Sequence, residues 1–265
     1  MAHRNFTIAL LISTYNWPDA LELVFLSVLR QTEMPDEILI ADDGSREETR
    51  ELIDSYREKF NIPVKHAWHE DKGFRKSEVL NMAVKLAEAD YIIEIDGDII
   101  LDRRFIADHV KQAAKGFFVQ GSRAMINEPK TNELLKNKDV NLNPLSKGLY
   151  TRFNSYRIPS LAKFYDTKPL DPFNVKGCNL AFWRKDYIKV NGYYNDFEGW
   201  GWEDYEFAAR LINSGVYKKR VKMVAIMYHL FHKQTSRSSY FSNEVIYRRT
   251  VAEKLTYCDS GYAEV

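Results

Sequence analysis

The chain has 265 residues, of which 45% are hydrophobic and 14% aromatic. That length and composition predict one large or two small domains with a real core, and they exclude a mainly disordered chain. Its 38 lysines and arginines balance 37 aspartates and glutamates, so the net charge gives no reason to expect a nucleic-acid partner.

Cysteine usage and apolar runs indicate the compartment. Cys178 and Cys258 are too few for a disulfide framework and lack metal-site spacing, so we expect buried, reduced thiols in a cytosolic protein. The apolar run at residues 6–12 is too short to span a bilayer, and no other stretch is long enough. We therefore expect a soluble protein, or one that is peripheral on a membrane.

The first half of the chain alternates apolar runs with helical patterns. The apolar runs, which predict strands, are residues 6–13, 38–41, 64–68 and 91–95. Three helical patterns follow these runs, at residues 18–31, after Ser45 and around residues 80–87. Ser45 and Glu48 together form a predicted capping box at the start of the second pattern. Such alternation predicts right-handed crossovers and a mostly parallel central sheet flanked by helices, an α/β fold.

The second half is less regular. Residues 122–176 contain five prolines and predict short helices that border the ligand cleft. Residues 177–183 and 221–228 predict strands, and a further helix begins near Glu203. In the tail from Lys233, arginines alternate with aromatic residues.

Polar and acidic side chains gather at the carboxyl ends of three predicted strands, where sheets of this class bind ligands. These ends are residues 13–16, 42–45 and 96–98. Asp96 and Asp98 flank a glycine that permits a tight turn, so both carboxylates can face one divalent cation. A plain strand-terminating turn is the alternative. The position after the most hydrophobic strand favours the metal site.

The other two strand ends indicate a nucleoside. Of the adjacent acids at positions 42 and 43, one can accept hydrogen bonds from a base or a ribose. Tyr15, at the end of the neighbouring strand, can stack on that base. The plainer alternative for positions 42–45 is a turn with a helix cap, and for Tyr15 it is a half-buried structural tyrosine.

Phosphate recognition must come from side chains and a metal. The chain has neither G-x-G-x-x-G nor G-x-x-x-x-G-K-[ST], which argues against dinucleotide oxidoreductases and P-loop enzymes. Instead Lys72, Arg75 and Lys76 surround Gly73 just before a helix, where cations suit a diphosphate. A solvated loop is the alternative.

Residues 199–206, Gly-Trp-Gly-Trp-Glu-Asp-Tyr-Glu, are the least ordinary stretch. Trp200 and Trp202 between glycines suit sugar faces better than they suit a helix or strand. Glu203 and Asp204 lie in the first turn of the next helix, as capping acids or with one as a general base. A helix N-terminus lowers a carboxylate pKa, whereas a base works best near the operating pH, and burial by the tryptophans would offset this.

Two histidines follow the last predicted strand, His229 and His232. A lone histidine is usually structural. Two of them at the same edge of the sheet are candidate metal or phosphate ligands.

These motifs together resemble those of the inverting glycosyltransferases of family 2, which have the nucleotide-sugar-binding GT-A fold. The motifs at 13–16, 42–45 and 96–98 resemble that family's successive nucleotide-site motifs, the last being its DxD motif. Residues 177–204 resemble the C-terminal module shared with β-1,4-galactosyltransferases and bacterial chondroitin polymerase. The resemblance covers residues 6–232.

The resemblance implies a role for each candidate residue at the nucleotide end. Asp43 would bind uracil with Tyr15 alongside it, and Asp96 would touch the ribose. Asp98 and His229 would ligate Mn²⁺ or Mg²⁺, with His232 as the alternative to His229. Residues near the nucleotide would be Arg75, Lys76 and Asn81.

At the sugar end, the resemblance makes Asp204 the catalytic base. Glu203 would bind an acceptor or donor sugar, and Trp200 would be a sugar platform. Trp202 stands where the galactosyltransferases have a glycine, which is a departure at the acceptor site.

The resemblance also implies an organisation and a reaction. Residues 1–121 would be the nucleotide-sugar-binding half, 122–232 the acceptor-binding and catalytic half of the same domain, and 233–265 a tail. Independently of the resemblance, the interleaved arginines and aromatic residues of residues 233–254 predict peripheral contact with the inner face of a membrane, and a helix packed on the domain is the alternative. The reaction would move a sugar from a UDP-sugar to a glycan or lipid-linked glycan acceptor, and the expected sugar is galactose or an N-acetylhexosamine. It would take place in the cytoplasm, in the synthesis of a cell-surface polysaccharide or lipopolysaccharide. The sequence predicts no oligomeric state.

Two other classes remain open at this stage. A sugar nucleotidylyltransferase shares the sheet and the metal-binding acids, but would show a glycine-rich loop and a lysine near the first strand. A non-catalytic carbohydrate-binding protein would keep the tryptophans without needing Asp96 and Asp98.

Overall fold

The computed structural model describes all residues except 1–3, 166–169, 174 and 234–237. The strands are β1 (Ile8–Thr14), β2 (Glu37–Asp42), β3 (Val64–Trp68), β4 (Tyr91–Asp96), β5 (Ile99–Leu101), β6 (Phe117–Gln120), β7 (Ala124–Met125), β8 (Leu180–Trp183), β9 (Tyr217–Arg220) and β10 (Met227–His229). The α-helices are α1 (Pro18–Val28), α2 (Glu47–Phe60), α3 (Lys76–Lys85), α4 (Phe105–Gln112), α5 (Glu128–Asn137), α6 (Pro159–Ala162), α7 (Arg184–Lys189), α8 (Glu203–Asn213) and α9 (Tyr240–Ala252). The 3₁₀ turns are η1 (Arg152–Ser155), η2 (Lys163–Tyr165), η3 (Gly177–Asn179) and η4 (Tyr262–Glu264).

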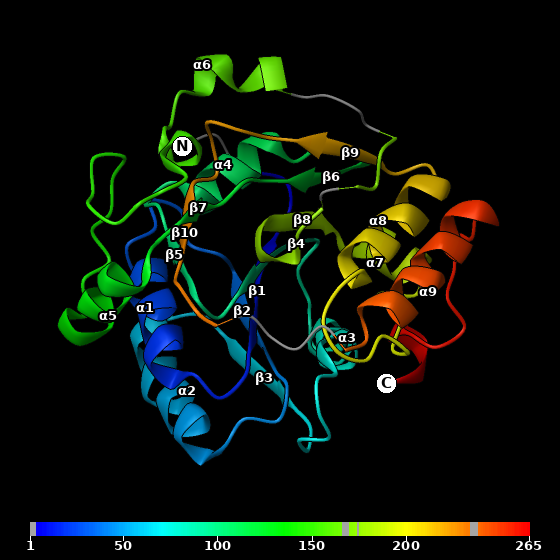
Figure 1. Cartoon of the computed structure of the whole chain (residues 1–265), viewed down its shortest axis with the longest axis horizontal. Helices are drawn as coiled ribbons and strands as arrows, with labels where there is room; N and C mark the ends of the chain where they lie inside the picture. The colour runs from blue at the N-terminus through cyan, green and yellow to red at the C-terminus, as the bar shows by residue number, and fades with distance from the viewer. Residues whose placement is uncertain (1–3, 166–169, 174, 234–237) are drawn as a thin grey trace.

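The main sheet has the strand order β3-β2-β1-β4-β8-β6-β9. The four strands from β3 to β4 are parallel, β6 and β9 are parallel to each other, and β8 runs antiparallel to both β4 and β6. Every residue of β1 is buried, because helices cover both faces of the sheet (Figure 1). The predicted α/β fold with a mostly parallel sheet is confirmed.

An apolar core on each face holds the helices against the sheet. On one face α1, α2 and α4 bury side chains such as Phe25 and Tyr56. On the other face α3, α7 and α8 bury side chains such as Leu80 and Phe207. Successive residues of β1 alternate between the two cores, as the side-chain period of a strand requires. The central strands are therefore fixed from both sides, and so are the loops at their carboxyl ends.

A second, small sheet of order β5-β10-β7 brings the end of the last strand to the acidic turn after β4. β10 pairs antiparallel with β5, so that His229 lies opposite Ile99. The N–H of Leu230 also donates to the carbonyl oxygen of Asp98 at 3.0 Å. These backbone bonds fix the segment from His229 onward beside Asp98.

Two strands predicted in the second half are wrong in extent. Of residues 177–183, only β8 is a strand, and the first three residues form η3. Of residues 221–228, only the last two belong to a strand, β10. Met223 and Ala225 have φ values of 62° and 50°, and such values interrupt an extended backbone. The edge strand β9, with the sequence Tyr-Lys-Lys-Arg, was not predicted because it has no apolar run.

The capping box predicted from Ser45 and Glu48 is absent. α2 begins at Glu47, and its N-terminus has no side-chain cap. The Ser45 hydroxyl oxygen instead accepts the N–H of Asn16 at 2.8 Å, and the Ser45 N–H donates to the Asp42 carboxylate at 2.9 Å. The serine therefore ties together the loops that follow β1 and β2.

The second half of the chain contains both cysteines, the predicted excursion and one strand of the main sheet. Both cysteines are buried and free, as expected. The excursion at residues 122–176 contains the predicted short helices, although 166–169 and 174 lie outside the described residues. β8, from that half, lies between β4 and β6 in the main sheet. The division at residues 121 and 232 stays a prediction.

The C-terminal tail forms a helix on the domain. α9 packs against α8, and Tyr247 stacks on Trp202 with ring centroids 5.0 Å apart. Residues 234–237 of the tail lie outside the described part of the chain. No helix among the described residues is long and apolar enough to cross a membrane. Peripheral contact between the tail and a membrane stays a prediction.

We expect Tyr247→Ala to destabilise the protein by about 2–4 kcal/mol, because it removes a buried ring from the contact between α9 and Trp202. The free energy of unfolding in urea measures this loss. Phe241→Ala, on the exposed side of the same helix with 77% of its surface accessible, is the matched control and should change stability by less than about 0.5 kcal/mol. Equal effects of the two substitutions would show that α9 does not pack as described.

Candidate active site

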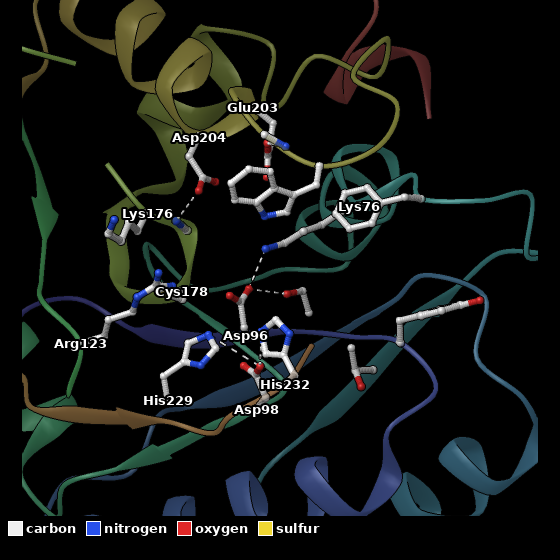
Figure 2. A pocket seen from close by; sticks show the side chains of 18 of the residues that line it. Lys76, Asp96, Asp98, Arg123, Lys176, Cys178, Glu203, Asp204, His229 and His232 are labelled. Carbon is white, nitrogen blue, oxygen red and sulfur yellow. Dashed lines mark hydrogen bonds and ion pairs between the residues drawn. The ribbon is translucent and has the colours of Figure 1, made fainter. Parts of the chain in front are cut away.

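The strand ends that the sequence singled out line one cavity of about 620 Å³. Figure 2 shows its centre, where side chains from the ends of β4 and β10 face the N-terminus of α8. The predicted site residues that line it are Tyr15, Asp43, Lys76, Asp96, Asp98, Trp200, Glu203, Asp204, His229 and His232. Residues that line it without having been predicted include Arg123, Tyr150, Lys176 and Cys178.

Asp43 is held at one end of the cavity by a histidine and a backbone amide. Its carboxylate contacts His69 Nε2 at 2.7 Å and accepts the N–H of Arg75 at 3.1 and 3.2 Å. Burial raises the pKa of Asp43, and these hydrogen bonds oppose that rise. Tyr15 is half exposed, and its hydroxyl donates to Asp71 at 2.9 Å. His69 was not predicted, because a single histidine in a loop carries no motif.

Two residues expected near the nucleotide have side chains that are not among the described residues lining the cavity. The guanidinium of Arg75 pairs with Glu78 at 2.7 Å, so Arg75 serves the site through its backbone N–H to Asp43. Asn81 is fully buried. Its amide donates to the carbonyl of Tyr193 at 2.7 Å, and its side-chain oxygen accepts the Tyr187 hydroxyl at 2.5 Å. Asn81 is thus satisfied by the protein.

Lys76 and Asp96 form an ion pair in the middle of the cavity (Figure 2). Lys76 Nζ lies 2.6 Å from Asp96 Oδ1, which also accepts the Ser13 hydroxyl at 3.0 Å. Burial favours the neutral forms of both groups, but the ammonium holds the pKa of Asp96 below its usual value. Against the same burial, the charges of Asp96, Asp204 and Glu94 hold the pKa of Lys76 well above its usual value. Both groups are therefore charged at neutral pH.

Asp98, His229 and His232 form a cluster that fits a metal ion. One ligand atom from each lies within 4.8 Å of the other two, with Nε2 of His229 and His232 at 3.7 and 3.4 Å from Asp98 Oδ2. Asp98 Oδ1 is buried without a hydrogen-bond partner among the described residues. A carboxylate with two imidazoles suits a first-row divalent metal. The sequence offered either histidine, and the structure brings both to Asp98.

The turn between the two acids requires glycine. A Cβ atom on Gly97 would lie 2.9 Å from the carbonyl oxygen of Ser13. The approach of β1 to this turn brings the Ser13 hydroxyl to Asp96, so the turn positions both carboxylates.

Asp204 and Glu203 occupy the N-terminus of α8, in the wall of the cavity opposite the metal cluster (Figure 2). Asp204 Oδ2 accepts the N–H of Gly177 at 2.8 Å, while Oδ1 is buried without a partner among the described residues. Glu203 accepts the N–H of Gly201 at 3.0 Å. Burial raises the pKa of Asp204, and burial together with the charge of Asp204 raises the pKa of Glu203 to about 8. Burial therefore outweighs the helix N-terminus.

The two tryptophans before α8 have different environments. Trp200 is 39% exposed and stacks on Tyr240, so one edge of the cavity carries an accessible aromatic ring. Trp202 is buried, and its φ of 76° puts it in the left-handed region at the helix N-cap. It packs between Tyr240 and Tyr247 of α9. The tail helix thus supports the segment that presents Asp204.

A buried carboxyl below Asp204 was missed in the sequence. Glu94 lies fully buried in β4 and accepts the Tyr193 hydroxyl at 3.0 Å. A Cβ atom on Gly177 would lie 2.7 Å from Asp204 Oδ1 and 2.8 Å from Glu94 Oε1. Burial raises the pKa of Glu94 well above its usual value. A glutamate inside the run Tyr-Ile-Ile-Glu-Ile was the signal that could have found it.

A cavity at the carboxyl ends of the strands is where open α/β sheets bind their ligands, and the structural neighbours reported below share this GT-A fold. The model of glycosyl transferase family 2 matches residues 9–187, and the chain belongs to that family. A model described as the N-terminal domain of galactosyltransferase matches residues 163–233. The chain is therefore a glycosyltransferase, and the family resemblance of its motifs is confirmed.

Known relatives and solved structures agree with this assignment. Hyaluronan synthase of Pasteurella multocida is 25% identical over 86% of this chain, which spans 25% of the length of that protein. TarS of S. aureus in complex with UDP has a TM-score of 0.63 at 14% identity, over 97% of this chain and 68% of that one. The mannosyltransferase PcManGT from Pyrobaculum calidifontis, in complex with GDP-Man and Mn²⁺, has a TM-score of 0.59 at 15% identity, over 96% of this chain and 64% of that one.

We expect Asp98→Ala to weaken Mn²⁺ binding by more than about tenfold, because loss of a ligand should cost at least as much as loss of an outer-shell partner. Titration of the protein with Mn²⁺, followed by electron paramagnetic resonance, measures the affinity. Asp54→Ala, at an exposed position on α2, is the control and should bind Mn²⁺ as the unchanged protein does. Unaltered affinity in Asp98→Ala would remove Asp98 from the metal site.

Proposed function

We propose that this chain is an inverting, metal-dependent glycosyltransferase that moves a sugar from a UDP-sugar to a hydroxyl of a glycan or lipid-linked glycan. Family membership supports glycosyl transfer. The UDP bound by the structural neighbour TarS supports the nucleotide, and the Mn²⁺ in PcManGT supports the metal. The donor sugar we propose is galactose or an N-acetylhexosamine, and the setting is cytoplasmic synthesis of a cell-surface polysaccharide or lipopolysaccharide.

The observation that carries this proposal is the state of Asp204. Asp204 lines the cavity; one carboxylate oxygen accepts the Gly177 N–H, and the other has no hydrogen-bond partner among the described residues. Burial raises its pKa, which makes the carboxylate a stronger base than an exposed aspartate. A general base needs a fixed orientation, a free lone pair and a raised pKa, and Asp204 has all three.

At the donor end, Asp43 would accept the N–H of uracil, with Tyr15 beside the ring. Asp96 would contact the ribose, and Lys76 lies next to it as a cation for the diphosphate. A divalent ion held by Asp98, His229 and His232 would neutralise charge on the departing diphosphate.

At the acceptor end, Asp204 takes the proton of the acceptor hydroxyl while that oxygen bonds to the anomeric carbon. The bond from the anomeric carbon to the diphosphate breaks, and its electron pair leaves with UDP. Because the attack comes from the face opposite the diphosphate, a single displacement inverts the anomeric centre, through an oxocarbenium-like state such as glycosidases use. Glu203 and the exposed ring of Trp200 would position the sugars.

Hydrolysis of a panel of UDP-sugars, with and without Mn²⁺, tests the proposed function. We expect one or two of the sugars to release UDP in the presence of Mn²⁺ and none to do so in the presence of EDTA. Equal release under both conditions would contradict metal dependence, and a preference for another nucleotide would contradict the UDP site.

We expect Asp204→Asn to lower turnover by about two to four powers of ten, the usual contribution of a general base. The amide keeps the size and hydrogen bonding of the side chain but accepts no proton. Turnover and the dissociation constant of UDP are measured in parallel, and UDP binding should change little because other residues hold the nucleotide.

Asp186→Asn is the matched control, since Asp186 is a buried carboxyl that is not among the described residues lining the cavity. It should retain turnover. If Asp204→Asn loses UDP binding while turnover of the bound complex is preserved, Asp204 is a donor ligand, and Glu203 becomes the first candidate for the base.

The pH profile of kcat/KM should be bell-shaped, with limbs set by the acids of α8. Asp204 acts only when ionised, and because its pKa is raised, activity should fall with acid at a higher pH than an exposed aspartate would give. Glu203, with a pKa raised to about 8, is neutral at pH 7 and can donate a hydrogen bond to a sugar, so activity should fall again above about pH 8. Glu203→Gln should retain the acid limb and lose the alkaline one. An unchanged alkaline limb in that variant would exclude Glu203 as its source.

A further inference from the structure

Two cations in the cavity, Arg123 and Lys176, have no direct ion pair among the described residues, although Asp96 and Asp98 act on the first and Asp204 on the second at longer range. Lys76 pairs with Asp96, and Asp43 contacts His69. By contrast, Arg123 and Lys176 have no carboxylate oxygen within 4.0 Å among the described residues, although both line the cavity. The contact recorded for the Arg123 guanidinium is a weak one to the thiol of Cys178, at 3.8 Å.

These cations lie next to the proposed base. Residues 176–178 are consecutive: the middle one, Gly177, donates its N–H to Asp204, and Cys178 contacts Arg123. One short segment therefore carries Lys176 and joins Asp204 to Arg123. Figure 2 shows Arg123 and Lys176 on one side of Asp96 and Lys76 on the other side.

Two neighbouring, partly buried charges of the same sign are unfavourable without a counter-charge. Burial and the nearby Arg123 lower the pKa of Lys176, Arg220 at the end of β9 adds to the positive field, and the charge of Asp204 offsets them only in part. Such a pair is stabilised when an anionic group binds between the two cations, through charge-assisted hydrogen bonds.

We propose that Arg123 and Lys176 form a subsite for an anionic group, a carboxylate or a phosphate, on the acceptor sugar. This inference rests on the proposed function, because Asp204 marks where the acceptor hydroxyl reacts. An anion at Lys176 belongs to the sugar that contacts the base. For the donor diphosphate, Lys76 lies on the other side of Asp96 (Figure 2), and a divalent ion held by the metal cluster of Asp98 would supply further positive charge.

The surroundings of the pair suit a sugar ring. Tyr150 lines the cavity, is 60% exposed, and its N–H bonds to the carbonyl of Met125 at 3.2 Å, two residues beyond Arg123. Asn154 donates to the carbonyl of Arg123 at 2.8 Å. An accessible aromatic ring is thus tied to the backbone of residues 123–125, which gives a sugar a flat face near the guanidinium of Arg123.

Three methyl glucosides that differ only at C6 test the subsite: the glucoside, the glucuronoside and the glucoside 6-phosphate. Their affinities are measured by ligand-observed NMR on the protein saturated with UDP and Mn²⁺. We expect at least one anionic probe to bind about tenfold or more tightly than the neutral glucoside, and the two anionic probes distinguish a carboxylate from a phosphate. Equal affinity for all three, or no binding of any, overturns the proposal.

Substitutions assign the preference to the pair. Arg123→Gln and Lys176→Gln should each reduce the preference at least about threefold with UDP affinity unchanged within about twofold. Arg123→Lys, which retains the charge, should keep most of it. Lys147→Gln, at an exposed cation that is not among the described residues lining the cavity, is the control and should bind all probes as the unchanged protein does.

Two results with the variants overturn the proposal. One is a preference that survives both glutamine substitutions. The other is a loss of UDP affinity without a change in sugar preference, which assigns the cations to the diphosphate. Failure of the unchanged protein to bind UDP contradicts the proposed function instead, so the two failures are distinguishable.

Discussion

The ion pair between Lys76 and Asp96 makes the concentration of acids in the cavity tolerable. Asp96, Asp204 and Glu203 all act on the ammonium of Lys76, and its pKa is held well above the usual value although burial opposes its charge. Without a central cation, acids gathered from β4 and α8 would repel one another in a poorly solvated space. Because Lys76 is the first residue of α3, the packing of that helix on the sheet also sets the electrostatics of the site.

The charge of Lys76 does not act equally on its neighbours, and this difference separates their roles. Asp96 touches the ammonium, and its pKa is lowered despite burial, so it remains an ion. Asp204 and Glu203 are farther along the wall, burial dominates, and their pKa values are raised. One cavity thus contains a charged acid beside Lys76 and two acids at the N-terminus of α8 whose pKa values are raised, and these correspond to the proposed donor and acceptor ends. That separation is what a transferase needs, since charge must be neutralised at one end and a proton accepted at the other.

The sequence predicted the features that depend on local pattern. Buried strands such as β1 and β4 are continuous apolar runs, and the acids that follow them come to one edge because parallel strands end together. The tryptophan and acid pattern before α8 was also readable, because it has no ordinary structural explanation. His229 and His232 were recognised as a pair next to a strand, and the register of β10 against β5 explains why both reach Asp98.

What the sequence did not predict depends on contacts between distant segments. Arg123 and Lys176 are 53 positions apart, and they come near each other where β8 pairs with β6. Asn81 and Arg75 were expected at the nucleotide, but Asn81 is held by Tyr187 and Tyr193, and the Arg75 guanidinium by Glu78. Ser45 gave a capping pattern but bonds to Asn16 across two loops. Local pattern cannot distinguish a polar residue that serves a ligand from one that serves the fold.

The configuration of the transferred sugar tests the central claim most directly, since the claim is one displacement assisted by Asp204 from the face opposite the diphosphate. Proton NMR can record the anomer first formed when an α-linked UDP-sugar that the chain accepts is turned over in the presence of Mn²⁺. The account predicts the β configuration in the first product, before mutarotation in the case of water as acceptor. An α product would require two displacements or a same-face reaction, and it would contradict the role given to Asp204.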